Sequence, residues 1–357
     1  MMDRDSVGVR VPKIYGEKAI VLANSLKITD RELEIQKDEK FIYIPLSREP
    51  SKTEIGSLKK QIPELKVSKY TFHEKKRQAR TVAELLENQL APHLLASLPH
   101  AIDFVGDIAI IELSQELEPH KTAVGEAILK THKNVHTVLA KAGAVGGTYR
   151  LREFKLIAGE PKTETIHKEY GCKYHVDVAK AYFSPRLSTE HKRVASLVKD
   201  GETVVDMFAG VGPFAIQIAK AKEKVQVYAV DVNPYAVELL KENIRLNKVN
   251  SKVHSFLGDS RQIVRERLRG VADRAIMNLP EKAFEYVDVA CEALKPEGGI
   301  VHFYNFVNAS ETVDNMKLRF ADAVKSSGRE VKQILLSRFV RETAPYEWQM
   351  VLDAEIR

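Results

Sequence analysis

VVDMFAGVGPF, at residues 204–214, is the most informative stretch of this 357-residue chain. An apolar run ends in Asp206, a Gly-x-Gly turn follows, and a helix-forming run begins near Phe214. Glycines allow such a turn to bring bare backbone against a ligand. A second apolar run, 225–230, ends in Asp231, at a position where an acid usually binds the hydroxyl pair of a ribose. The stretch therefore predicts a nucleoside-binding α/β sheet.

Polar side chains also follow the next two expected strands. Asp259 ends the third, and Asn278-Leu279-Pro280 follows the fourth. In an open α/β sheet, ligands lie outside the carboxyl ends of the strands. Pro280 would stiffen the loop and hold the Asn278 amide where it suits the edge of a base. Each acid could instead cap the helix that follows it, but polar groups at four successive strand ends favour a ligand site.

Strands and helices alternate from about Thr189 to the C-terminus. Five β/α repeats are followed by two strands joined by a short loop, which makes these two antiparallel. The fold class we expect is α/β: the Rossmann-like sheet of class I S-adenosylmethionine-dependent methyltransferases, with a middle α+β domain and a small N-terminal α/β domain. A nicotinamide oxidoreductase would share the glycine turn and Asp231. However, its sheet would continue in β/α units, and Pro213-Phe214 replaces the small residues that pack against a dinucleotide.

The length of the chain requires more than one hydrophobic core. We expect a small domain with a linker at 1–66, a middle domain at 67–188 with mostly antiparallel strands, and the methyltransferase domain at 189–357. The polar stretch 47–69 is expected to be the linker, with one weak helix.

The net charge of +6 indicates a polyanionic partner. Four cations cluster within residues 73–80, although such a run is more often a solvated face. The sequence has no apolar run of about 20 residues and no signal-peptide core at its start, so we expect a cytoplasmic protein. Cys172 and Cys291 are far apart without metal-ligand spacing, which predicts buried thiols and no metal.

Two further segments, 149–153 and 182–191, combine aromatic, basic and acidic residues. The second joins the two larger domains and must border their cleft. Its aromatic side chain could stack on a base, and its arginine could bind phosphate. Glu190 lies at the start of a helix, where the macrodipole favours the ionised carboxylate. A plain helix cap at Ser188 or Thr189 explains the same pattern equally well.

With these blocks together, the sequence resembles the archaeal and eukaryotic tRNA guanine-37 N1-methyltransferase family. The resemblance runs through nearly the whole chain, and its most specific part is DMFAGVGPF followed by Asn278-Leu279-Pro280. It implies transfer of a methyl group from S-adenosylmethionine to N1 of guanine 37 in tRNA. We expect a monomer, and the reaction requires no metal. The N-terminal unit resembles the small first domain of the family, which implies contact with the tRNA elbow.

The resemblance also implies roles for single residues. The N1 proton of guanine must leave as the methyl arrives, so the step needs a proton acceptor and a cation near O6. The implied catalytic residues are Glu190 as acceptor, Arg150 as cation, and Asn278 and Pro280 holding the base. The implied cofactor-binding residues are His191, Phe208, Gly210, Gly212, Asp231, Val232, Asp259, Ser260 and Asn278. The implied substrate contacts are Tyr182, Arg186 and Arg152.

His191 departs from the family pattern, which commonly has arginine at this position. An ionic contact to the methionine carboxylate is therefore not implied there. Other functions remain open on the sequence: an aminocarboxypropyl transferase of the wyosine pathway, a methylase of a wyosine intermediate at position 37, and an RNA-binding protein without catalysis. The aminocarboxypropyl transferase is not expected to keep Asn-Leu-Pro together with Arg150 and Glu190.

Overall fold

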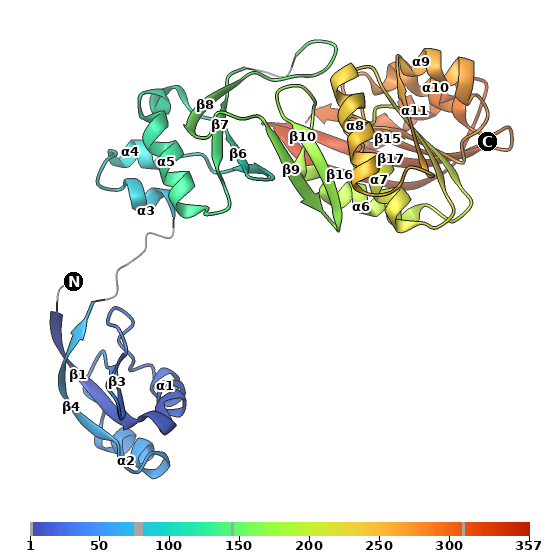
Figure 1. The fold of residues 1–357 in the computed structure, drawn as a ribbon. Helices are drawn as coiled ribbons and strands as arrows, with labels where there is room; N and C mark the ends of the chain where they lie inside the picture. Colours follow the sequence, from blue (N-terminus) through green and yellow to red (C-terminus); the bar gives the residue numbers. More distant parts are fainter. Residues whose placement is uncertain (1–2, 75–80, 144–145, 309–310) are drawn as a thin grey trace. The chain divides into compact units, whose positions relative to one another are not determined.

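The computed structural model describes residues 3–74, 81–143, 146–308 and 311–357. The chain forms two compact units, Met1–Arg80 and Thr81–Arg357, each with its own hydrophobic core (Figure 1). Most of the predicted basic cluster at 73–80 lies outside the described residues.

The first unit is a four-stranded antiparallel sheet in the order β2-β3-β1-β4, packed against two helices. Its elements are β1 Asp3–Pro12, η1 Lys13–Tyr15, α1 Gly16–Ser25, β2 Gln36–Lys37, β3 Phe41–Pro45, α2 Lys52–Gln61 and β4 Lys66–His73. The stretch 47–69 contains the expected helix, α2, but it belongs to this unit and is not a linker, because β4 is part of the sheet. Ser51 and Glu54 form a capping box that starts α2, and β4 pairs along β1. The polar composition misled because β4 is an edge strand with mostly exposed side chains.

The second unit begins with a module built on the four-stranded sheet β5-β6-β7-β8, in which only β6 and β7 pair in parallel. Strands β5 and β6 form a hairpin that turns at Gly106. A further hairpin, β9–β10, follows. The elements are α3 Val82–Leu86, α4 Pro92–Ala96, β5 Asp103–Val105, β6 Ile108–Ile111, η2 Gln115–His120, α5 Lys121–Thr131, β7 Thr137–Lys141, β8 Phe154–Gly159, β9 Glu164–Glu169 and β10 Cys172–Asp177.

The rest of the unit is a seven-stranded sheet in the order β13-β12-β11-β14-β15-β17-β16. The strands are parallel except β17, which pairs antiparallel with β15 and β16 and thereby confirms the predicted terminal hairpin. The strands are β11 Thr203–Asp206, β12 Gln226–Asp231, β13 Val253–Leu257, β14 Arg274–Met277, β15 Gly299–Asn308, β16 Val331–Ala344 and β17 Glu347–Ile356. The order reverses between β11 and β14, which is where open α/β sheets bind ligands.

Helices cover both faces of this sheet (Figure 1). One core lies under α6, α7 and α8, and the other under α9, α10 and α11. The helices are η3 Pro185–Leu187, α6 Ser188–Leu197, α7 Pro213–Ala221, α8 Pro234–Leu246, α9 Ser260–Ile263, η4 Val264–Leu268, η5 Ala283–Tyr286, α10 Val287–Ala293 and α11 Val313–Ser326.

Two asparagine side chains bind the free edge of β10: one is from α8, and the other is from the residue that caps its C-terminal end. The Asn243 amide accepts from the backbone N–H of His175 at 2.6 Å and donates to its carbonyl at 3.0 Å. The Asn247 amide does the same to Lys173, at 2.9 and 2.6 Å. Four residues of helix rise about 6 Å and two residues of strand about 6.6 Å, so the two spacings match. This asparagine clasp attaches the β9–β10 hairpin to the large sheet.

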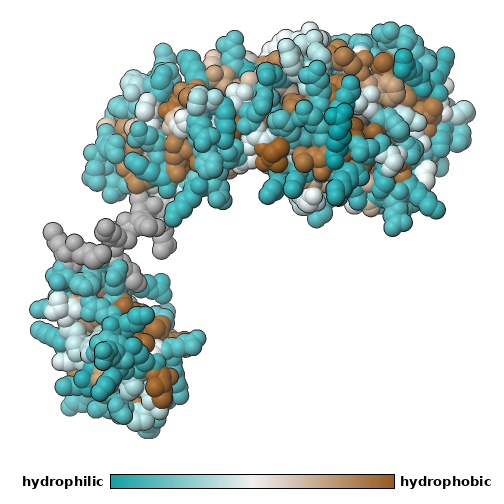
Figure 2. Space-filling model, viewed as in Figure 1, coloured by the Kyte–Doolittle hydropathy of each residue, from teal (hydrophilic) through white to brown (hydrophobic). Residues whose placement is uncertain are grey.

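Figure 2 shows mainly hydrophilic side chains over the visible face of each unit. None of the helices in the described ranges combines the length and apolar character that crossing a bilayer requires.

Gly212→Ala tests the turn before α7. Gly212 has φ of +91°, and a Cβ there would lie 2.4 Å from Cδ1 of Leu240, which is fully buried. We expect a loss of about 1–3 kcal/mol of unfolding free energy beyond that of Gly270→Ala, measured by urea denaturation. Gly270 has a similar φ of +70° but open space around it. Equal losses for the two variants would show that the crowding has no effect.

Candidate functional site

Asp231 holds the glycine turn against the end of β12. One carboxylate oxygen accepts from the Gly210 N–H at 2.7 Å and the other from the Asn233 N–H at 2.9 Å. Burial raises the pKa of Asp231, while these backbone donors lower it in part. The Asn233 side chain also donates to the Lys180 carbonyl at 2.7 Å, which connects this strand end to the segment leading to Tyr182.

A cavity of about 180 Å³ opens at the carboxyl ends of β11, β12, β13 and β14. Seven of the predicted cofactor-binding residues line it: Phe208, Gly210, Asp231, Val232, Asp259, Ser260 and Asn278. Tyr286, which the sequence did not single out, adds an aromatic wall. Its ring meets Phe208 edge-on at 5.0 Å and lies under the Arg261 guanidinium at 3.8 Å. The result is a pocket with apolar walls and few polar groups, as small-molecule sites usually are.

Asp206 ends β11, two residues before Phe208, which lines this cavity, and it is fully buried. Neither carboxylate oxygen makes a hydrogen bond of good geometry to any described residue. Burial raises its pKa to about 7; the backbone N–H of Phe208 partly offsets this, and the Asp231 carboxylate raises it further. An unpaired buried carboxyl group beside a ligand pocket stores unfavourable energy that a cation could release.

A second cavity, of about 340 Å³, lies between the first module and the large sheet. The predicted substrate residues Tyr182, Arg186 and Arg152 line it, and so does Arg150. Arg186 is held by Asp103 through two hydrogen bonds, at 2.5 and 3.1 Å. The two cavities share three lining residues, Arg150, Tyr182 and Glu281, so they adjoin across one wall.

Arg150 occupies this shared wall in a strained backbone conformation, with φ of +55°. Its guanidinium donates to Glu281 at 3.1 Å and lies 5.1 Å from the centre of the Tyr182 ring. Its Nε is buried and makes no hydrogen bond within the described part of the chain. Left-handed backbone at a residue other than glycine costs about 1–3 kcal/mol and concentrates at functional sites. Arg150 is thus placed where it can contact ligands in both cavities.

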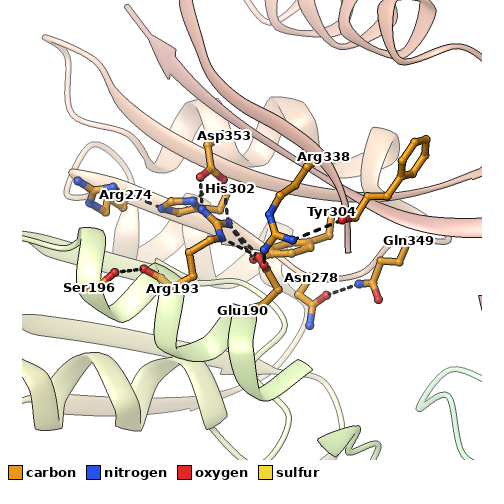
Figure 3. A network of polar contacts seen from close by, with 11 residues as sticks. Glu190, Arg193, Ser196, Arg274, Asn278, His302, Tyr304, Arg338, Gln349 and Asp353 are labelled. Atoms are coloured by element: carbon orange, nitrogen blue, oxygen red, sulfur yellow. Dashed lines mark hydrogen bonds and ion pairs between the residues drawn. The ribbon is translucent and has the colours of Figure 1, made fainter. Parts of the chain in front are cut away.

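Glu190 lies in a buried network of polar contacts rather than in either cavity (Figure 3). It is fully buried on α6. Its carboxylate accepts from Tyr304 at 2.9 Å and forms ion pairs with Arg193 and Arg338. Burial and the neighbouring Glu190 charge raise the pKa of Tyr304, so the phenol keeps its proton and donates.

The strand register shows how far Glu190 lies from the second cavity. Phe306, Gln349 and Arg341 stand opposite one another on β15, β17 and β16, at the cavity end. Tyr304 and Arg338, the partners of Glu190, belong to the next row on the same face. Two residues along a strand span about 7 Å. Glu190 is therefore one row below the cavity, and the structure does not bring it to the ligand pockets.

Three other predicted residues do not line either cavity. His191 is buried, binds Glu169 at 2.9 Å and packs edge-on against Phe214. Gly212 is the N-cap residue of α7. Pro280 accepts a hydrogen bond from the Phe306 N–H at 3.4 Å, which ties the Asn278–Pro280 loop to β15.

The sequence did not reveal Arg341, Gln349 and Glu281. Arg341 and Glu281 line the second cavity, and Gln349 binds Asn278. Arg341 and Gln349 lie opposite each other in the terminal hairpin of β16 and β17. The alternation of polar residues in this hairpin is typical of a sheet face that is exposed to solvent. Glu281 directly follows the Asn278-Leu279-Pro280 motif, which could have drawn attention to that position.

Three family models match successive parts of the chain. The TRM5/TYW2 methyltransferase domain matches residues 165–332, the TYW2 N-terminal domain 82–163, and the tRNA methyltransferase 5 N-terminal domain 8–54.

Two relatives match most of the chain. tRNA (guanine(37)-N(1))-methyltransferase Trm5b of Pyrococcus abyssi is 37% identical over 98% of this chain and 99% of its own. tRNA(Phe) (4-demethylwyosine(37)-C(7)) aminocarboxypropyltransferase of Pyrococcus horikoshii is 34% identical over 77% of this chain and 96% of its own.

Solved structures agree with these matches. The complex of aTrm5 with tRNALeu superposes with a TM-score of 0.77, at 30% identity, over 98% of this chain and 100% of that one. Methanocaldococcus jannaschii Trm5 in complex with adenosine has a TM-score of 0.64, at 30% identity, over 98% and 99%.

Asp206→Asn should remove a specific dependence of stability on pH. The pKa of Asp206 is raised from 3.8 to about 7 on folding, so the folded state binds the extra proton between these values. Stability contributed by this group therefore falls as the pH rises from 4 to 7, by roughly 4 kcal/mol in total. The difference in unfolding free energy between variant and parent should grow by that order over the same range. The exposed Asp314→Asn serves as control, and parallel pH curves for Asp206→Asn and the parent would contradict the assignment.

Proposed function

Because this chain belongs to the TRM5/TYW2 methyltransferase family, we propose that it transfers a methyl group from S-adenosylmethionine to N1 of guanine 37 in tRNA. The Pyrococcus abyssi relative, which aligns with 98% of this chain, carries that activity in its name. The aminocarboxypropyltransferase aligns with only 77% of the chain, whereas the first unit matches the tRNA methyltransferase 5 N-terminal domain. The N-terminal match thus favours methyl transfer over aminocarboxypropyl transfer.

The observation that carries the proposal is the pair of cavities with a common wall. A group transfer from a cofactor to a base needs two adjoining sites, with the reacting atoms held in line. Arg150, Tyr182 and Glu281 belong to both sites. The first site would hold the cofactor and the second the base of the RNA.

The residues of the first cavity fit S-adenosylmethionine. The Asp231 carboxylate lies at the end of β12, where an acid binds ribose hydroxyls. Phe208 and Tyr286 offer apolar faces for an adenine ring, with Asp259 and Ser260 beside them. When bound, the cofactor supplies an electrophilic methyl on a sulfonium centre. The buried Asp206 carboxyl group behind the cavity would favour that positive charge.

The residues at the shared wall fit a flipped-out guanine. N1 of guanine is paired in a duplex, so the base must leave the stack before it reacts. Tyr182 offers an aromatic face, and the Arg150 guanidinium offers donors toward the negative charge that develops on O6. The pairing of Arg150 with Glu281 positions the guanidinium before RNA binds.

Glu190 is the base that we propose for the N1 proton, on two conditions: the flipped base must reach one strand row below the second cavity, and Glu190 must release one of its partners. Its carboxylate is bound by Arg338, whose side chain is 41% exposed on β16. An exposed arginine can exchange a carboxylate for a phosphate of the RNA backbone. Release of Arg338 would free one Glu190 oxygen, while Arg193 and Tyr304 retain the other.

We also propose that the protein acts as a monomer in the cytoplasm and that its first unit contacts the tRNA elbow. Support for the last point is the match of residues 8–54 to the tRNA methyltransferase 5 N-terminal domain. The net charge of +6 suits the RNA partner.

Transfer of labelled methyl to tRNA transcripts tests the function. We expect incorporation into transcripts with guanine at position 37 and none with adenine there. Mass analysis of the modified nucleoside should give 1-methylguanosine. A mass increase larger than one methyl group would identify aminocarboxypropyl transfer instead, and cofactor binding without turnover would leave an RNA-binding protein.

Arg150→Ala and Glu190→Gln should each slow single-turnover methyl transfer by roughly 100-fold or more. Cofactor affinity should change less than the rate, because the Asp231 carboxylate and the glycine turn, proposed to hold the adenosine, pair with neither side chain. The exposed Arg265→Ala, whose partners are Asp288 and Glu292, is the control. Loss of thermal stability in Glu190→Gln with an unchanged rate would refute its role as base.

A further inference from the structure

Asn278 is joined to β16 by a short chain of hydrogen bonds. The Gln349 side chain on β17 donates from Nε2 to Oδ1 of Asn278 at 3.1 Å (Figure 3). The Nε of Arg341 donates to Oε1 of Gln349 at 2.9 Å. Gln349 is 1% exposed, so neither end of its amide exchanges freely with water.

A β-bulge places Arg341 on this side of the sheet. Arg338 pairs with Val351 and Arg341 with Gln349, with a register irregularity between Phe339 and Arg341. In a regular strand, side chains three residues apart point to opposite faces. The extra residue at the bulge turns both arginines to the face that carries α6 and the second cavity.

Arg341 is fixed by three acceptors. Besides Gln349, it donates to the Ser184 hydroxyl at 2.8 Å and to the Tyr182 hydroxyl at 3.1 Å. Tyr182 and Ser184 precede α6 and line the second cavity. The guanidinium is therefore oriented independently of any ligand.

The donors and acceptors available on Arg341, Gln349 and Asn278 fix the direction of each hydrogen bond between them. A guanidinium has donors only, so Gln349 must present its oxygen to Arg341 and its amino group to Asn278. Asn278 must then present its oxygen to Gln349, and its own amino group is left toward the ligand cavity that it lines. A different polarity would put two donors or two acceptors face to face.

We propose that Arg341 and Gln349 are positioning residues that fix Asn278 as a hydrogen-bond donor, so that the site selects a base with an acceptor beside Asn278. This inference rests on the proposed function and deepens it. Guanine presents the acceptor O6 on the edge next to N1, whereas adenine presents an amino donor there. The Arg341–Gln349 relay would thus contribute to the preference for guanine without contacting it.

Gln349→Glu and Gln349→Met separate this role from a structural one. In Gln349→Glu, one carboxylate oxygen keeps Arg341 and the other can only accept. Asn278 then turns its amino group to the carboxylate and its oxygen to the cavity. Gln349→Met breaks the relay but imposes no orientation. We expect single-turnover methyl transfer to fall in the order parent, Gln349→Met, Gln349→Glu, with the last roughly 100-fold slower than the parent.

The opposite order would overturn the proposal. If Gln349 served only packing and pairing, the charge pair of Glu with Arg341 would keep Gln349→Glu closer to the parent than Gln349→Met. Gln349→Glu should also add nothing to the loss caused by Asn278→Ala, because it acts through Asn278. Additive losses would likewise contradict the proposal. Cofactor affinity and unfolding free energy of each variant establish that it is folded.

Hydrogen exchange of the side-chain amide measures the orientation of Asn278 independently of catalysis. With asparagine labelled by ¹⁵N and the signal assigned by its loss in Asn278→Asp, the parent should show fast exchange of the Asn278 amino protons, which face the cavity. Gln349→Glu should slow this exchange. Equal protection in both proteins would overturn the relay, even if methyl transfer is confirmed. Absence of transfer by the parent, with the expected exchange difference, would instead refute the proposed function alone.

Discussion

The asparagine clasp on the edge of β10 is the contact on which the two-module site depends. Backbone groups at a strand edge need partners, and two amides on one side of α8 supply them at matching spacing. The clasp fixes the β9–β10 hairpin on the large sheet. The chain from β10 then leads directly through Tyr182 to α6, so the cavity between the modules has a defined width.

The two cavities differ in what supports their residues. The cofactor cavity is built from strand ends and the backbone of the glycine turn, and Asp231 ties these together through two N–H groups. The second cavity depends on arginines held by acceptors on other elements: Arg150 by Glu281, Arg186 by Asp103, and Arg341 by Tyr182 and Ser184. Such pre-paired guanidinium groups retain their orientation while remaining able to exchange partners with a phosphate.

The sequence predicted the large sheet well because buried parallel strands are short apolar runs that end in polar residues. The same signal located Asp231, Asp259 and Asn278, all of which line the first cavity. It failed where the determining contacts are long-range. Two of the partners that bury Glu190, Tyr304 and Arg338, lie 114 and 148 residues away, and the start of a helix does not reveal them. Strands β4 and β9 were missed because polar residues on exposed faces give no apolar alternation.

The separate core of the first unit bears on how stability should be described. Val9, Ile28, Ile44 and Ile62 pack among residues of that unit alone, so nothing in that core requires the rest of the chain to be folded. We therefore expect at least two unfolding transitions, which a single melting temperature would not describe. A small molecule bound in the cofactor cavity would raise the midpoint of only the transition that destroys the cavity. The other transition would stay in place and act as an internal reference for ligand binding.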